Sequence, residues 1–170
     1  MANLKRISPD GVVSALEKSH TYRLLNEPLH AESICLDVLA VDPQNQRALV
    51  TLVLALTDQF PTRQQDARQR AEGLIPQLVS EYEQRYYAGI ILERWARVQF
   101  ESGTNLRSVP EWLSKAMECY ELAENLSNHQ RPDPILRWNA CARLSEMVHL
   151  AEPERESLTR DIQSEFGGDV

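Results

Sequence analysis

Histidine and cysteine, the residue types that most often carry chemistry, are few and scattered in this chain. The four histidines and three cysteines form no HExxH and no CxxC, and no histidine pairs with a cysteine at zinc-ligand spacing. Cys141 and His149 are about two helical turns apart, so they could share one helix face. The alternative, which we favour, is a core thiol and a histidine at the edge of the core. The sequence therefore predicts no metal site and no cofactor.

Carboxylate pairs and phosphate-binding glycines are the other patterns that would indicate catalysis. Glu81 and Glu83, and the acidic residues in the segment 152–156, are typical of solvated helix faces. The chain has neither a GxGxxG nor a P-loop motif. We therefore expect that the protein is not an enzyme. An enzyme or small-molecule binder with an enclosed pocket in a helical bundle stays open as the alternative.

Composition and charge limit the class of protein further. The chain has 170 residues, 42% of them hydrophobic and 25% charged, as expected for one globular domain. Its 25 acidic and 18 basic residues give a net charge of -7, which argues against a nucleic-acid partner. The cysteines are odd in number and far apart, so we expect reduced, buried thiols. No signal-peptide pattern and no apolar run near 20 residues is present, which favours a cytoplasmic protein without a membrane partner.

The longest apolar run, Ala48 to Leu56, predicts the architecture. Asn45 before it is a good N-cap, and Phe60 with Pro61 ends the segment after about 14 residues, which is a helix length. A helix that is apolar nearly all round must be buried on several sides. We therefore expect an interior helix here.

Caps and prolines divide the rest of the chain into about eight helices joined by short links, with no strand signal. Gly103 is expected to end a long helix that begins near Glu81, and Pro76 to end or kink a helix near Leu74. The other helices are expected to start at prolines or at capping-box residues, namely Pro9, Pro28, Thr62, Ser80, Ser108, Asp133 with Pro134, and Pro153.

Several of these helices match the pattern of one repeat family. Second-helix patterns occur at Ala31-x3-Cys35 and at Ala116-x3-Tyr120, and a first-helix pattern runs from Leu49 to Leu56. Trp138-x2-Cys141-Ala142 gives another fair first-helix match. In these segments the chain resembles a tetratricopeptide-repeat protein. It departs from the family at Val53, which fills a small-residue position, and between residues 66 and 100, where the register slips.

The resemblance implies an all-α fold, a right-handed superhelix of stacked antiparallel hairpins, formed by one domain over residues 9–166. Residues 1–8 and 167–170 would be flexible termini. The family holds a partner peptide or helix in a concave groove lined by the first helix of each hairpin. The positions that this register places in the groove are Arg47, Val50, Leu54, Asp58, Asn139 and Arg143.

Trp95 is the remaining candidate contact. Like Trp112 and Trp138 it is expected to pack in the core, but it lies between Arg94 and Arg97, where an exposed aromatic residue could anchor a partner.

For Arg143, the alternative to a groove contact is an ion pair with Glu146 on a solvated face. The expected function is a protein–protein interaction scaffold. A chaperone or assembly factor of the same fold is the alternative, and self-association through an uncapped end stays open.

Overall fold

The computed structural model describes the backbone of residues 3–62 and 64–166 and the side chains of residues 3–62 and 65–151. Within that part the chain is all-helical and has no strand, so the all-α prediction is confirmed. The predicted flexible ends, 1–8 and 167–170, lie partly or wholly outside the described residues.

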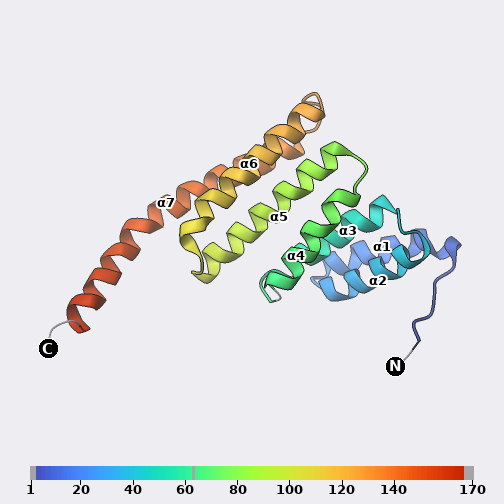
Figure 1. The fold of residues 1–170 in the computed structure, drawn as a ribbon, viewed down its shortest axis with the longest axis horizontal. Coiled ribbons are helices and arrows are strands. Elements are labelled where there is room, and N and C mark those ends of the chain that lie inside the picture. Colours follow the sequence, from blue (N-terminus) through green and yellow to red (C-terminus); the bar gives the residue numbers. More distant parts are fainter. Residues whose placement is uncertain (1–2, 63, 167–170) are drawn as a thin grey trace.

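The described residues form seven α-helices, which follow one another in chain order (Figure 1). They are α1 (Val12–Leu24), α2 (Pro28–Val41), α3 (Gln46–Thr57), α4 (Gln64–Leu74), α5 (Glu81–Ser102), α6 (Val109–Leu126) and α7 (Asp133–Phe166). Three short 3-10 helices accompany them, at Pro9–Gly11, Ile75–Gln77 and Leu106–Ser108.

Local signals set many of the helix ends. The Asn45 side chain accepts a hydrogen bond from the Ala48 N–H at 3.0 Å, and the Ser80 hydroxyl accepts one from the Glu83 N–H at 3.4 Å. Gly103 ends α5 with φ 71°, the left-handed conformation that glycine adopts without strain. Pro76 lies two residues after Leu74, the last residue of α4, in a 3-10 helix. These four expectations are confirmed.

One predicted helix start, at Pro153, is wrong, and another, at Ser108, is correct because α6 begins at Val109, but it lacks the expected capping hydrogen bond. Ser108 makes no capping hydrogen bond, because a 3-10 helix precedes α6 and already holds Ser108 in a helical conformation rather than the extended one of an N-cap. Pro153 does not open a further helix, since α7 runs from Asp133 to Phe166 without a break. A single proline removes only one backbone hydrogen bond, and the strong helix formers on both sides of Pro153 favour continuation. The expected eight helices are therefore seven.

The apolar run that we expected to form an interior helix is α3. Ala48, Val53 and Ala55 have no exposed surface, and Leu52 is 3% exposed. Helices α1, α2, α4 and α5 all contact α3, which explains why nearly every face of it is apolar. The prediction of an interior helix is confirmed.

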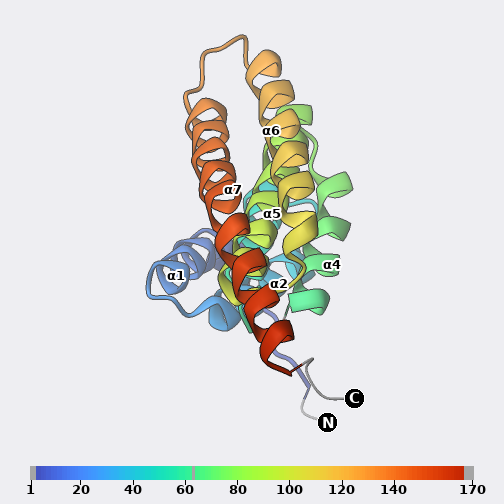
Figure 2. The same cartoon turned by 90° about the vertical axis from the view of Figure 1, so that its left-hand side faces the viewer.

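Each helix packs mainly on the next one along the chain, and a second set of contacts joins α1 to α3, α3 to α5 and α5 to α7. These four helices therefore form one layer, which we call the odd-helix layer. Figure 2 shows α1 and the first half of α7 on the left of the molecule, and α4 and α6 on the right. Alanines with no exposed surface allow close helix approach at Ala31, Ala67, Ala116 and Ala123.

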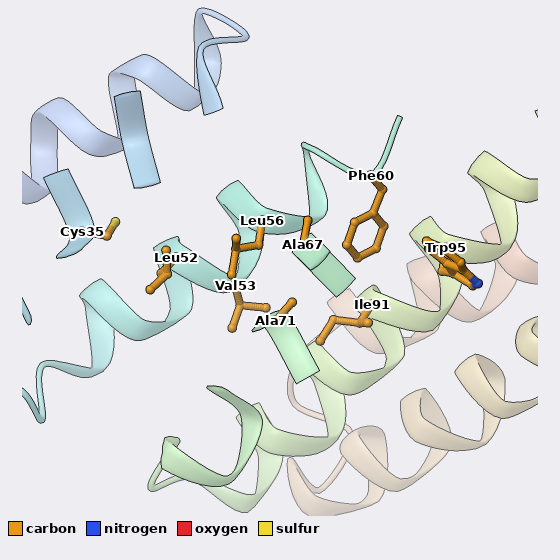
Figure 3. Close-up of a cluster of buried hydrophobic side chains, with 9 residues drawn as sticks. All are labelled: Cys35, Leu52, Val53, Leu56, Phe60, Ala67, Ala71, Ile91 and Trp95. Atoms are coloured by element: carbon orange, nitrogen blue, oxygen red, sulfur yellow. The ribbon is translucent and has the colours of Figure 1, made fainter. Parts of the chain in front are cut away.

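The core consists of three clusters of buried side chains. The first lies between α2, α3, α4 and α5 and includes Phe60 and Trp95 (Figure 3). The second joins α5, α6 and α7 around Tyr120, and the third joins α1 to α2 and α3 around Leu16. A Cβ atom on Gly89 would lie 2.6 Å from Cε1 of Tyr120, so the contact between α5 and α6 requires a glycine there.

The cysteines match the sequence prediction in part. All three are free thiols, and Cys35 and Cys141 are buried, but Cys119 is only half-buried. Within the residues that the structure describes, no helix is both long and apolar enough to cross a membrane.

Candidate functional site

Asp58 joins three helices of the odd-helix layer. It lies at the end of α3, where its Oδ2 accepts a hydrogen bond from Nε of Arg23 on α1 at 2.8 Å. Its Oδ1 accepts one from Arg94 on α5, and Nη1 of Arg94 also donates to the Thr57 hydroxyl at 2.8 Å. A carboxylate at a helix C-terminus is unfavourable beside the partial negative charge of the last carbonyls. The two guanidinium groups offset that cost and fix α1 and α5 against α3.

Glu93 of α5 joins α5 to α6 and α7 through hydrogen bonds, as Asp58 joins α3 to α1 and α5. Its side chain is 2% exposed and accepts hydrogen bonds from the Tyr120 hydroxyl at 2.7 Å and from Nη1 of Arg137 at 3.3 Å. Nη2 of Arg97 lies 3.8 Å from Oε1 of Glu93. Burial raises the pKa of Tyr120 far above its ordinary value, and the Glu93 carboxylate adds to this, so the phenol stays a hydrogen-bond donor. A buried carboxylate persists only when it is paired in this way.

Four arginines consequently lie along the odd-helix layer, and we call Arg23, Arg94, Arg97 and Arg137 the arginine strip. Arg94 and Arg97 are three residues apart on α5 and so share one helix face. Within the part of the chain that the structure describes, these four guanidinium groups form ion pairs with two carboxylates, Asp58 and Glu93. The strip thus carries an excess of two positive charges in a chain whose net charge is -7.

These contacts do not occupy all N–H donors of the guanidinium groups in the strip. The side chains of Arg97 and Arg137 are 44% and 36% exposed; Arg137 is hydrogen-bonded to Glu93 and Tyr86, and Arg97 lies 3.8 Å from Glu93. A guanidinium has five N–H donors in a planar fork that matches a carboxylate. The strip therefore presents donors to solvent that can bind a further anionic group.

Tyrosines of α5 lie next to the strip. Tyr86 stacks on Tyr82 with ring centroids 5.8 Å apart, and the Arg131 guanidinium lies 4.4 Å from the Tyr82 ring centroid. Burial raises the pKa of Tyr87 to about 12, with the carboxylate of Glu83 adding to the shift. The surface beside the arginines is thus partly aromatic and uncharged at neutral pH.

A surface cavity of about 460 Å³ lies at the Asp58 end of the strip. The turn between α1 and α2 lines it on one side, with Pro28 and Leu29, and Pro61 lines it on the other. Glu32, which is 8% exposed, accepts a hydrogen bond from Nε2 of Gln59, another lining residue, at 2.6 Å and is also paired with Arg70 of α4. The carboxylate of Glu32 on α2 therefore holds Gln59, which follows α3, and Arg70 of α4 in place next to the cavity.

The residues expected in the groove from α3 are placed differently from one another. Asp58 lies at one end of the strip, where it pairs with Arg23 and Arg94. Leu54 is half-buried and packs against the second core cluster, so it lies between α3 and α5. Val50 is half-buried and Arg47 exposed. Of these four positions, the structure joins Asp58 alone to the arginine strip by described contacts.

Trp95 lies in the core. It is 6% exposed, and its ring meets Phe60 and Trp112 edge to face at centroid distances of 5.7 and 6.0 Å. The Arg68 guanidinium covers the ring at 4.7 Å. The core prediction for Trp95 is confirmed, and the alternative of an exposed partner anchor is wrong, because α4 and α6 cover this face of α5.

The two candidates on α7 lie apart from the strip. Asn139 is half-buried and Arg143 exposed, and among the described residues Arg143 has no ion-pair partner, Glu146 included. Their part in binding stays a prediction, and the proposed Arg143–Glu146 pair is not formed.

Sequence reasoning missed the arginine strip. The one signal for it is Glu93, a single acidic residue that follows the apolar residues Gly89 to Leu92, which indicates a buried charge that needs cations beside it. Nothing in the sequence shows that Arg23 and Arg137 supply contacts from opposite ends of the chain.

No protein-family model matches the chain, and neither a curated protein nor a solved structure shows significant similarity to it. The side chains that the structure describes include no cluster of three or more histidine, cysteine or acidic residues that could hold a metal ion.

Proposed function

We propose that this protein is a non-enzymatic interaction scaffold that holds an acidic peptide segment of another protein against the arginine strip. The observation that carries the proposal is the excess of guanidinium groups on the odd-helix layer of an acidic chain. Local positive charge in an acidic protein favours an acidic partner and disfavours nucleic acid, whose phosphates the rest of the surface repels.

The fold that we propose for this role is a short tetratricopeptide-like array. Its odd-numbered helices would line the concave side of a right-handed superhelix, as the first helices of the hairpins do in that family. The contacts between successive odd-numbered helices and the buried alanines between hairpins support this proposal.

Binding would combine charge with one apolar contact. Carboxylates of the partner would accept charge-assisted hydrogen bonds from the exposed edges of Arg97 and Arg137. An apolar side chain of the same segment would enter the cavity between Leu29 and Pro61. This matches the general mode in which pockets provide affinity and a few charged groups fix register.

Two other functions are the alternatives. A chaperone or assembly factor would use the same surface for a partner that is later released. An enzyme or small-molecule binder would need convergent polar groups in an enclosed pocket, whereas the cavity beside Asp58 opens onto the surface. The free thiols are in keeping with a reducing compartment such as the cytoplasm.

The test is capture of partners from a native lysate on immobilised wild-type protein and on two variants. Arg97→Gln removes the most exposed guanidinium of the strip, and Arg107→Gln is the control, since Arg107 is exposed and has no ion pair among the described residues. Loss of one hydrogen bond between charged groups should weaken binding by about tenfold. We expect partners with acidic segments, retained by wild type and by Arg107→Gln but depleted on Arg97→Gln. Equal capture by all three proteins would contradict the proposal.

A further inference from the structure

Helix α7 carries two rows of side chains. One row packs into the second core cluster through Cys141, Leu144 and Val148. The other row lies on a different face and repeats at alternating spacings of four and three residues, the spacing of a helix that packs on another helix. We call it the outer stripe, and it consists of Leu136, Ala140, Arg143, Met147 and Leu150.

Apart from half-buried Ala140, the outer stripe is exposed although it is largely apolar. Leu136, Met147 and Leu150 are 63%, 57% and 76% exposed, and the stripe extends over about 21 Å of helix. α7 is the last helix of the stack, and its C-terminal half extends beyond α5 and α6 (Figure 1). Contiguous exposed apolar surface of this kind marks an interaction site.

Arg143 lies at the centre of the stripe, seven residues from Leu136 and seven from Leu150. It is exposed and has no ion-pair partner among the described residues. A cation in the middle of an apolar contact surface must be paired when a partner covers it, because an unpaired buried charge is costly. The chemistry of the stripe therefore specifies both an apolar contact and one acidic group.

We propose that the outer stripe is the docking site for an amphipathic helix of a partner protein, one that carries an acidic residue midway along its apolar face. Apolar residues of that helix would pack on Leu136, Met147 and Leu150, and its carboxylate would pair with Arg143. This is a second interaction surface, separate from the arginine strip.

The position of Arg143 also argues against a second copy of this chain as the occupant. A two-fold pairing of α7 with its equivalent, centred on the stripe, would place Arg143 against Arg143 in either a parallel or an antiparallel arrangement. Like charges at the centre of an apolar interface are repulsive. An acidic partner helix turns the same residue into an attractive contact.

The test uses full-length protein and two synthetic 15-residue helical peptides. Both have leucines along one face at the spacing of the stripe, and they differ only in a central glutamate or lysine. Binding is measured by fluorescence anisotropy to wild type, to Arg143→Glu and to the control Arg107→Glu, with circular dichroism as the folding check. We expect wild type and Arg107→Glu to bind the glutamate peptide about tenfold or more tighter than the lysine peptide, and Arg143→Glu to reverse that order.

An unchanged order in Arg143→Glu, or equal binding of both peptides by wild type, would overturn the proposal. Met147→Asp should abolish binding of both peptides and tests the apolar contact independently of Arg143. Wild type that sediments as a dimer, with Met147→Asp as a monomer, would assign the stripe to a second copy and so refute a partner helix.

The remaining occupant is the chain's own segment 154–166, which would reach the stripe if α7 broke at Pro153. Spin labels at Asp133 and Ser164 distinguish the two arrangements, because a continuous α7 separates these two residues by 31 helical steps, or about 46 Å. A distance below about 25 Å would show that the segment folds back and would overturn the proposal.

Discussion

Tyr120→Phe removes one hydroxyl from the buried contact with Glu93 and changes almost nothing else. Tyr120 has no exposed surface, and its hydroxyl donates to Oε2 of Glu93 at 2.7 Å. Phenylalanine fills the same space, so no cavity opens beyond the missing oxygen. A hydrogen bond to a charged group contributes about 1.5–3 kcal/mol, and its loss leaves a buried carboxylate with one donor fewer. We expect the free energy of unfolding to fall by about 2 kcal/mol.

The assay is urea unfolding followed by circular dichroism, with Tyr22→Phe as the matched control. Tyr22 is half-buried and stacks on His30, without a described hydrogen bond from its hydroxyl, so its variant should change stability by less than about 0.5 kcal/mol. In a Glu93→Gln background the hydroxyl should contribute only about 1 kcal/mol, as expected for a neutral pair. Tyr120→Phe with the stability of wild type would refute the view that Glu93 is an anion held by its donors.

Three further predictions concern the packing. Gly89→Ala should lower the free energy of unfolding, measured in urea, by about 1–2 kcal/mol, because the overlap of the new Cβ with the Tyr120 ring costs more than the gain in helix propensity. A variant as stable as wild type would show that α6 can move away from α5. Leu52→Asp should unfold the domain, since it buries an unpaired charge, and an unchanged melting temperature would contradict the interior position of α3. An aqueous thiol reagent should label Cys119 before Cys35 and Cys141. Burial raises the pKa of Cys35 to about 11 and that of Cys141 to about 12, so the labelling rate of these two thiols in the native state should still increase between pH 8 and 10. Equal labelling rates at all three thiols would contradict the burial of Cys35 and Cys141 in the core.

Features that depend on a few neighbouring residues could be predicted from the sequence. Asn45, Ser80 and Gly103 act through hydrogen bonds or backbone conformations within four residues, and the helix ends that they predict are correct. The apolar run of α3 likewise indicates burial on all sides, whatever the neighbours are. The capping box predicted at Ser108 and the helix start predicted at Pro153 are absent because two local preferences compete there, and the sequence does not show which one is stronger.

The arginine strip could not be predicted because it depends on the order in which helices stack. Arg23 and Arg94 meet on Asp58 only because α1, α3 and α5 are neighbours in one layer. A sequence pattern reports which face of a helix is apolar, but not which distant helix supplies the partner for a charge on its edge. The prediction of Asp58 as a site residue rested on repeat register and gave no sign of the cations around it.

The contacts that hold the strip together also prepare it for binding. Arg94 is fixed by Asp58 and Thr57, so it loses little side-chain freedom when a partner binds, whereas a free surface arginine loses about 2 kcal/mol of rotamer entropy. The same contacts mean that removal of Arg23, Arg94 or Arg137 weakens the fold together with the surface. Arg97 differs, because it lies 3.8 Å from Glu93, beyond hydrogen-bond distance, and 44% of its side chain is exposed. Within the strip, Arg97→Gln therefore separates a loss of binding from a loss of folding.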